Sequence, residues 1–391
     1  MAENNVKNMI GKVFGDIADA METGQFGSRV RVGITTLGSE HGVDNLIKGA
    51  ELAQERDPSM EVVLIGPETE SELTKVVVES EDEGYRKMED MLDKGEIDAC
   101  VTMHYNFPIG VSTVGRVITP GVGREMLVAT TTGTSASHRT EAMVINGING
   151  IIAAKAMGIE NPTVGILNVD SARPVERAFN ELNANGYEIN LTESMRADGG
   201  SVMRGNDLLV GTPDVMVTDT LTGNILMKIF SSYTTGGSYE AQGYGYGPGI
   251  GEGYDRTVLI LSRASGIPVV ANAISYGASL AKGGIQDIVK TEFDKANKAG
   301  LKDILEGLTK DTRKVEDEEE VEAPPKETVT GTISGIDIMD LEDAVRAIWK
   351  EGIYAESGMG CTGPIVMVNE ERVDEAVKIL SDAGYAAGAG E

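Results

Sequence analysis

The chain has 391 residues, 41% of them hydrophobic, which is enough for two lobes and an appendage around a substantial core. Its formal net charge of −28 at pH 7 is typical of a well-solvated surface and argues against a nucleic-acid partner, because binding to a phosphate backbone needs a basic surface. No apolar run approaches the length of a membrane span, so we expect no membrane partner.

Residues 1–27 predict an amphipathic N-terminal helix and not a secretory leader. Apolar side chains recur at helical spacing from Val6 to Ile17, and no cleavage-type apolar region follows them. The two cysteines, Cys100 and Cys361, lie far apart in the chain, which argues against a disulfide framework. We therefore expect reduced thiols and a cytoplasmic location.

Short apolar runs alternate with helical segments after residue 28, a pattern typical of βαβ units around a parallel sheet. Buried strands are predicted at residues 29–34, 61–66, 97–103, 163–168, 214–219, 258–261 and 268–271. Helices are predicted at residues 46–52, 69–80, 82–94, 140–157, 174–185, 281–291 and 293–306. We expect these elements to form one α/β domain over residues 28–314.

Residues 234–254 are rich in glycine and show no periodicity. Such a stretch is compatible either with a flexible surface excursion or with a lid or partner-binding loop. A block of acidic residues followed by two prolines predicts an extended linker at residues 315–327. Residues 328–391 then predict a small α/β module, with two helices and a strand at residues 341–349, 372–380 and 365–368.

Cys361 is the strongest candidate for covalent chemistry. Glycines surround it in the segment Ser357-Gly-Met-Gly-Cys-Thr-Gly-Pro364, so a ligand can approach the sulfur and backbone N–H groups can face an anion. Such amides lower the pKa of a thiol and stabilise a tetrahedral oxyanion. The same residues are also compatible with a tight turn that merely contains a cysteine. Cys100 lies in an apolar run that favours a core position, and neither cysteine has zinc-site spacing, so we expect no metal.

Two loops near histidines offer candidate binding residues. His41 lies in a glycine-flanked loop after the first predicted strand, where ligand clefts of open α/β sheets form, although a single histidine is also compatible with a structural role. The polar run at residues 130–139 leads into a helix. Its Ser135, His138 and Arg139 either bind phosphate or cap that helix.

A third loop, Asp219-Thr-Leu-Thr-Gly-Asn224, follows a predicted strand and precedes a helix. It offers candidate substrate-binding groups at a sheet edge, together with an amine further along the helix: Asp219, Thr222, Gly223, Asn224 and Lys228. The sequence has no Walker loop and no Gly-x-Gly-x-x-Gly after a strand, so we expect no cofactor.

Three segments resemble the phosphate acyltransferase family, which makes acyl phosphates from acyl thioesters for phospholipid synthesis. Residues 37–42 resemble its Met-Gly-Gly-Asp-His-Gly loop, and residues 139–168 resemble its central helix and strand. Residues 217–228 resemble its Val-Thr-Asp-Gly-Phe-x-Gly-Asn segment and the following lysine. The resemblance covers about residues 28–295 and implies a two-lobed, three-layer α/β/α fold related to phosphotransacetylases and isocitrate dehydrogenase-like enzymes.

The chain departs from that family pattern at several positions. Ser39 and Thr220 replace glycines, and residues 275–279 stand in place of a Gly-His-Gly-Ser-Ser segment. Together with the glycine-rich stretch and the tethered module, these departures argue against long fatty acyl substrates.

The whole chain, including the segment around Cys361, is similar to the alpha subunits of component C of the glycine/sarcosine/betaine reductase complexes of anaerobic, amino-acid-fermenting bacteria. This resemblance implies an oligomeric assembly with the beta subunit of component C and with carboxymethylated selenoprotein A. It also implies that an acetyl group from carboxymethyl-selenocysteine is released by inorganic phosphate as acetyl phosphate.

We therefore expect an acyltransferase in which Cys361 carries the acetyl group as a thioester and the linker lets the module move between partner and phosphate cleft. In this hypothesis Cys361 and His41 are the catalytic residues, and His41 assists as a hydrogen-bond donor. The loops at His41, residues 135–139 and residues 219–224, together with Lys228, hold phosphate against the thioester carbonyl. Three alternatives remain: a phosphate:acyl-[acyl carrier protein] acyltransferase of phospholipid synthesis, a nicotinamide dehydrogenase on a related fold, and a non-catalytic scaffold subunit.

Overall fold

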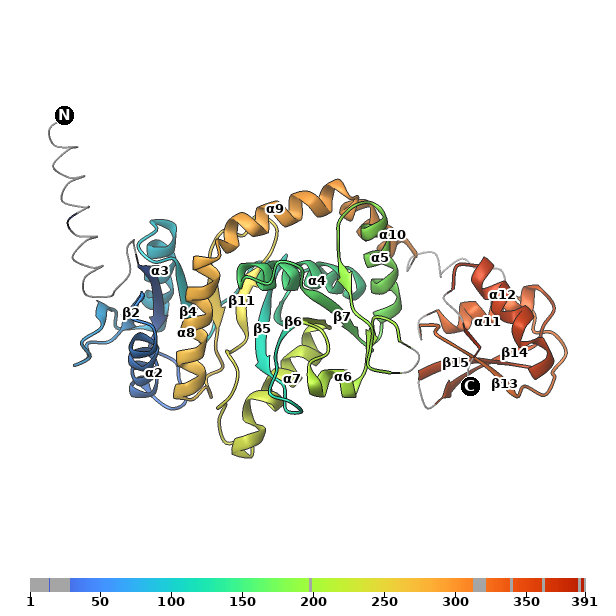
Figure 1. The fold of residues 1–391 in the computed structure, drawn as a ribbon, viewed down its shortest axis with the longest axis horizontal. Coiled ribbons are helices and arrows are strands. Elements are labelled where there is room, and N and C mark those ends of the chain that lie inside the picture. The colour runs from blue at the N-terminus through green and yellow to red at the C-terminus, as the bar shows by residue number, and fades with distance from the viewer. Residues whose placement is uncertain are drawn as a thin grey trace.

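The computed structural model of the chain describes Phe14 and residues 29–196, 199–311, 321–337, 340–360, 363–385 and 388–389 (Figure 1). The helix predicted over residues 1–27, except Phe14, lies outside the described residues, and so does Cys361. Within the described ranges, no helix has both the length and the apolar character that crossing a membrane requires.

A mixed sheet of twelve strands, counted over the described residues, forms the centre of the main domain. Five strands at one end are parallel: β3 (Thr74–Val77), β2 (Met60–Gly66), β1 (Val30–Thr35), β4 (Ala99–Thr102) and β12 (Val258–Ile260). At the other end another five are parallel to one another: β6 (Glu125–Thr134), β10 (Val215–Val217), β7 (Thr163–Leu167), β8 (Asn190–Leu191) and β9 (Val202–Met203). Between them lie β11 (Gly247–Ile250) and β5 (Val111–Ile118). The pairings β12–β11, β11–β5 and β5–β6 are antiparallel, so the two parallel sets run in opposite directions.

Helices cover both faces of this sheet (Figure 1). One face carries α2 (Val43–Arg56), α4 (Arg139–Ala156), α5 (Ala172–Ala184), α8 (Ile267–Lys282), α9 (Ile285–Lys298) and α10 (Leu301–Asp311). The opposite face carries α3 (Glu81–Asp93), α6 (Gly205–Val210), α7 (Thr220–Ser232) and the 3-10 turn Tyr233–Thr235. Alternating side chains fill both layers: Val32 and Ile34 pack in the α2 and α8 layer, whereas Val63 and Ile65 pack with α3. The predicted two-lobed, three-layer α/β fold is confirmed.

Several predicted elements differ from the structure. Residues 69–80 form no helix, because their β-branched run Val76-Val-Val78 favours a strand, and β3 occupies that place. Residues 268–271 are the first turn of α8 and not a strand. Pro268 is tolerated there because an N–H in the first helical turn has no partner within the helix. The helices predicted at 281–291 and 293–306 are α9 and α10, which begin later in the chain.

The apolar pattern does not predict β5 and β6, because threonines interrupt their apolar runs. In the structure Thr113, Thr130 and Thr131 are buried and hydrogen-bonded. The Thr113 and Thr131 hydroxyls lie 2.6 Å apart, and Thr131 Oγ1 donates to the carbonyl of Tyr246 at 2.8 Å. A buried hydroxyl with such partners carries little penalty, so polar residues can occupy central strands.

The glycine-rich stretch at residues 234–254 contains a central strand of the sheet and is not a surface excursion over its whole length. All four residues of β11 are buried between β12 and β5. A Cβ on Gly247 would lie 1.8 Å from the Val114 carbonyl oxygen, and one on Gly249 would lie 2.3 Å from the Phe107 ring. These glycines therefore permit close approach of neighbouring backbone and side chains.

The C-terminal module is a four-stranded antiparallel sheet, counted over the described residues, in the order β14 (Ala355–Gly360), β15 (Gly363–Val368), β13 (Gly331–Ser334) and β16 (Gly388–Ala389). It is covered by α11 (Leu341–Lys350) and α12 (Val373–Asp382), the latter following the 3-10 turn Glu370–Arg372. Its apolar core, around Ile333, Ile348 and Val366, is separate from the main core. The predicted small α/β module is confirmed, and its boundary at residues 315–327 stays a prediction.

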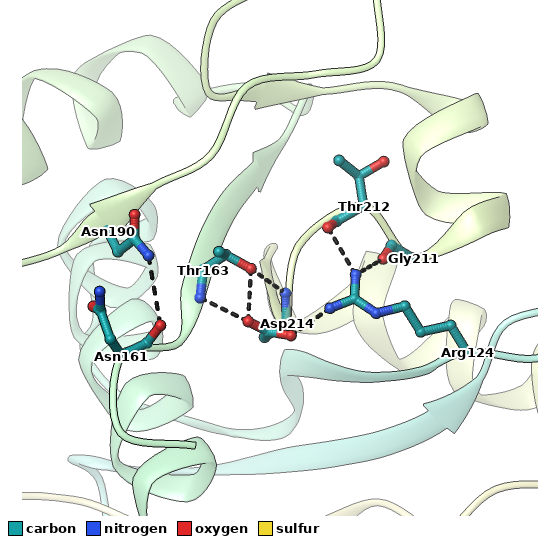
Figure 2. Close-up of polar contacts among 7 residues, drawn as sticks. All are labelled: Arg124, Asn161, Thr163, Asn190, Gly211, Thr212 and Asp214. Atoms are coloured by element: carbon teal, nitrogen blue, oxygen red, sulfur yellow. Dashed lines mark hydrogen bonds and ion pairs between the residues drawn. The ribbon is translucent and has the colours of Figure 1, made fainter.

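The amino ends of β6, β7 and β10 are joined by a polar network (Figure 2). The Asp214 carboxylate accepts from the Thr163 N–H at 2.8 Å, from the Thr163 hydroxyl at 2.7 Å, and from the guanidinium of Arg124. Arg124 also donates to the carbonyls of Gly211 and Thr212. These contacts fix the edge of the second lobe that lies opposite the carboxyl ends of its strands.

Candidate active site

The direction of the strands divides the predicted site residues into two groups. Loops that follow β1 and β12 lie at one edge of the sheet, and loops that follow β6, β7 and β10 lie at the opposite edge. His41 belongs to the first edge, whereas residues 135–139 and 219–224 belong to the second. The structure therefore does not bring all of these groups together around one phosphate.

The Arg139 group lies at the carboxyl ends of β6, β7 and β10. Arg139 Nη1 lies 3.2 Å from Asp170 Oδ2, and Nη2 lies 3.1 Å from Asp219 Oδ2. Asp219 occupies the N-cap position of α7 and accepts from the Thr222 N–H at 3.1 Å and the Thr222 hydroxyl at 2.6 Å. Burial of this carboxyl opposes its ionisation, but the contacts with Thr222 and Arg139 outweigh burial and place the pKa of Asp219 below its ordinary value. The structure thus brings Arg139 and Asp219 together, with two carboxylates around one cation.

Ser135 and His138 occupy structural positions near that group. Ser135 is buried, and its hydroxyl lies 2.7 Å from Ser112 Oγ and within hydrogen-bond distance of the side-chain oxygen of Asn146 in α4. His138 occupies the N-cap position of α4, where its carbonyl accepts from the Ala142 N–H. These two residues fix the start of α4 beneath the sheet edge.

Gly223 and Asn224 attach α7 to the end of β6. A Cβ on Gly223 would lie 1.7 Å from the carbonyl oxygen of Thr130, so this position requires glycine. Asn224 Nδ2 donates to the Thr131 carbonyl at 3.0 Å, and the hydroxyl of Thr220 donates to the Gly133 carbonyl at 3.3 Å. The first turn of α7 is thereby held against the strand, which positions Asp219 for Arg139.

His41 lies in an exposed turn after β1, beside the loop that follows β12. Its Nε2 lies 3.3 Å from the carbonyl oxygen of Ala264, and its ring meets the Tyr239 ring edge-on at 6.1 Å between centroids. Residues 275–279, which stand in place of the Gly-His-Gly-Ser-Ser segment, lie inside α8. The loop after β12, at residues 261–266, is the one that faces His41.

Lys228, a predicted candidate, lies in a chain of polar side chains near His41 whose other members were not predicted from the sequence. Lys228 Nζ donates to the Tyr246 hydroxyl at 3.2 Å, Tyr246 donates to Glu240 Oε1 at 3.2 Å, and the Ser265 hydroxyl donates to Glu240 Oε2 at 3.1 Å. Glu240 is only 4% exposed, and burial raises its pKa, as it does that of Tyr246. The only sequence signal was a carboxylate within the glycine-rich stretch, which shows no periodicity.

The structure describes Cys100 but not Cys361. Cys100 is fully buried in β4 with its Sγ near the Val101 carbonyl, and burial raises the pKa of its thiol. This is the setting of an unreactive core residue. Strands β14 and β15 pair as far as Gly360 and Gly363, and Cys361 between them lies outside the described residues. Over the residues that are described, no three His, Cys, Asp or Glu side chains gather as a metal site.

Comparison with known proteins identifies several relatives. Residues 30–367 match the model of a family described as fatty acid synthesis protein. Over 384 residues, 98% of this chain and 100% of the relative, the chain is 68% identical to the glycine/sarcosine/betaine reductase complex component C subunit alpha of Peptoclostridium acidaminophilum. It is 28% identical over 238 residues to the phosphate acyltransferase of Lysinibacillus sphaericus, which covers 51% of this chain and 70% of that protein.

Solved structures give a weaker similarity. A branched-chain phosphotransacylase from Enterococcus faecalis superposes on 64% of this chain and 99% of its own, with a TM-score of 0.44 and 16% sequence identity. A 4-hydroxythreonine-4-phosphate dehydrogenase from Klebsiella pneumoniae superposes on 65% of this chain with a TM-score of 0.42 and 14% identity.

Proposed function

Because the chain belongs to the fatty acid synthesis protein family and, within it, to the component C alpha subunits, we propose that it is an acyltransferase that releases an enzyme-bound acetyl group to phosphate. The observation that carries this proposal is the similarity over 98% of the chain to a component C alpha subunit, which includes the module with Cys361. Phosphate acyltransferases, in contrast, match about half of the chain.

In the proposed reaction Cys361 carries the acetyl group as a thioester. A phosphate oxygen attacks the thioester carbonyl carbon, the carbon–oxygen bond forms, and the carbon–sulfur bond breaks. The thiolate takes the proton of the hydrogen phosphate dianion, so the products are acetyl phosphate and the free Cys361 thiol. Phosphate needs no strong base in this step, because its dianion is already nucleophilic near neutral pH. Orientation and charge neutralisation are the requirements.

The proposed partners go beyond the relative's name, which is that of one subunit of a reductase complex. Carboxymethylated selenoprotein A would supply the two carbon atoms of the acetyl group, and a thiol would supply the two electrons that break the carbon–selenium bond. The beta subunit of component C would be the other partner. This assignment also accounts for the departures from phosphate acyltransferases at Ser39 and Thr220, since long fatty acyl chains are not the substrate.

The test is intact-protein mass spectrometry after incubation with acetyl phosphate, followed by peptide mapping. The reverse reaction should load one hydroxylamine-labile acetyl group on Cys361 without the selenoprotein. Cys361→Ser should lose this label, whereas Cys100→Ala should keep it, since the Cys100 sulfur is buried.

Two results would contradict the proposal. Absence of the label, with the beta subunit present, would favour a scaffold subunit. Turnover of long-chain acyl thioesters that survives Cys361→Ser would favour a phosphate acyltransferase of phospholipid synthesis.

A further inference from the structure

A cavity of about 250 Å³ lies between the main domain and the C-terminal module. The loop after β7, the first turn of α5 and the segment around β9 form its main-domain wall, and residues at the end of β13 and the start of β15 form its module wall. In Figure 1 the module lies beyond β7 and α5. Arg177 of α5 forms an ion pair of 3.1 Å with Asp340 of the module, so the two walls are also in direct contact.

Three arginines from three separate segments line this cavity. Arg173 lies in the first turn of α5, Arg196 in the loop before β9, and Arg204 immediately before α6. Two carboxylates, Asp170 and Asp337, also line it. Arg173 also forms an ion pair of 2.8 Å with Glu176. The three guanidinium groups outnumber the two lining carboxylates, which favours an anion in this part of a chain whose net charge is −28. Guanidinium groups match the oxygen geometry of phosphate better than any other side chain.

The amino terminus of α5 contributes to the same wall. Ala172 and Arg173 of its first turn line the cavity, and that turn, which the structure describes in full, carries no acidic side chain. The N–H groups of a first helical turn carry partial positive charge, which favours an anion in front of them. The helix end and the arginines therefore both favour an anion in the cavity.

The module wall connects this cavity to the proposed acyl carrier. Pro364 of β15 lines the cavity, and Cys361 lies three residues earlier in the chain. Three residues span at most about 11 Å even when fully extended, so the covalent chain itself limits the distance between the two residues.

We propose that this cavity binds the phosphate of the reaction, as inorganic phosphate before acyl transfer and as the phosphoryl group of acetyl phosphate afterwards. This inference rests on the proposed function. Sites for drug-sized ligands occupy roughly 300 Å³ or more, so the cavity suits a smaller anion. The Arg139 group is a poorer place for phosphate, because it offers one guanidinium for two carboxylates, whereas three arginines and two carboxylates line the cavity.

Within the reaction the arginines neutralise charge and donate no proton. They orient the phosphate so that one oxygen attacks the thioester carbonyl carbon, while the leaving thiolate takes the proton of the phosphate. The ion pair between Arg177 and Asp340 contributes to docking of the module and does not line the cavity.

The test is isothermal titration of the full chain with inorganic phosphate and with acetyl phosphate in a phosphate-free buffer. The double variant Arg173→Gln/Arg204→Gln should weaken binding of both probes by at least about tenfold, because each loses charged hydrogen-bond donors. Asp337→Asn should strengthen binding by about threefold to tenfold, because it removes a like charge. Misfolding would weaken binding in any variant, so stronger binding by Asp337→Asn would exclude misfolding as the cause. The matched control, Arg86→Gln in α3, should stay within about twofold, because this exposed arginine neither lines the cavity nor contacts the module.

Acetyl labelling of Cys361 separates failure of this inference from failure of the proposed function. The double variant should still become labelled, but only at higher acetyl phosphate concentrations. Equal phosphate affinity and an equal concentration dependence in the double variant would overturn the cavity assignment and leave the proposed function intact. A wild-type chain that binds phosphate in the cavity but never becomes labelled would overturn the proposed function.

Discussion

Arg139 illustrates how the neighbours of a residue decide its chemistry. The sequence places a cation near hydroxyls and a helix start, which suggests phosphate binding. In the structure two aspartates share its guanidinium, and it joins the loops after β6, β7 and β10. Its main effect is therefore to fix the geometry of the sheet edge next to the arginine-lined cavity.

Asp219 gives a prediction at the scale of one residue. Asp219→Asn should lower the free energy of unfolding by about 1–2 kcal/mol at pH 7, because the carboxylate accepts charged hydrogen bonds in a largely buried position. The folded-state pKa lies below that of the unfolded chain, so the stabilisation is complete above about pH 5 and is lost as the pH falls through the unfolded-state and then the folded-state value.

Urea unfolding of wild type and variant between pH 7 and pH 3 measures this effect. The difference in unfolding free energy should be constant down to about pH 5 and should shrink at lower pH. The exposed Asp44→Asn in α2 is the control and should change stability by less than about 0.5 kcal/mol at either pH. A difference that grows toward low pH would contradict the prediction.

At the scale of elements, close approach of backbones decides where glycine is needed. Gly247 lets β11 lie against β5, and Gly223 lets α7 lie against β6. Both glycines lie in packed elements, so glycine at these positions indicates tight packing and not flexibility. The same packing brings Lys228 of α7 to Tyr246 and Glu240, near the loop after β12.

The network around Asp214 gives a prediction at this scale. Asp214→Ala should destabilise the main domain by about 2–3 kcal/mol, because the Thr163 donors and Arg124 lose their shared acceptor. Phosphate affinity should not change, since the network lies at the amino ends of β7 and β10 (Figure 2).

Urea unfolding followed by circular dichroism measures the first effect, and titration with phosphate well below the unfolding midpoint measures the second. A lower midpoint at an unchanged slope would show a pure loss of stability. If Asp214→Ala shifted the unfolding free energy by less than about 0.5 kcal/mol, the network would not stabilise the main domain as predicted.

At the scale of the whole molecule, two separate cores define two units. The main core runs through both lobes of the large sheet, whereas the module has its own cluster around Ile333, Ile348 and Val366. Side chains of the two units meet at the arginine-lined cavity and at the ion pair between Arg177 and Asp340. Exposed ion pairs contribute little stability, so the pair between Arg177 and Asp340 does not by itself hold the module in place.

Residues 328–391 expressed alone should therefore fold. We expect a cooperative urea transition and an unfolding free energy of about 3–6 kcal/mol, in line with a domain of this size. Circular dichroism and the dispersion of amide resonances measure the outcome. A fragment that collapses without a cooperative transition would show that the module depends on the main domain.

Much of the fold followed from local patterns. Apolar runs such as residues 61–66 and 163–168 are buried strands, and the helix over residues 140–157 is present, because each depends mainly on its own periodicity. The strands β5 and β6 escaped prediction because their buried threonines are satisfied by partners far away in sequence, such as Tyr246.

The sequence by itself determined the fold class, the separate C-terminal module and the family to which the chain belongs. The tertiary structure alone decided which residues share a site. Three antiparallel pairings reverse the second lobe, so His41 and Arg139 lie at opposite edges of the sheet although both follow strands. Arg173, Arg196 and Arg204 come together only in the folded main domain, and residues of the docked module complete the wall of their cavity. Strand direction and docking depend on contacts distant in the chain, which no local pattern encodes.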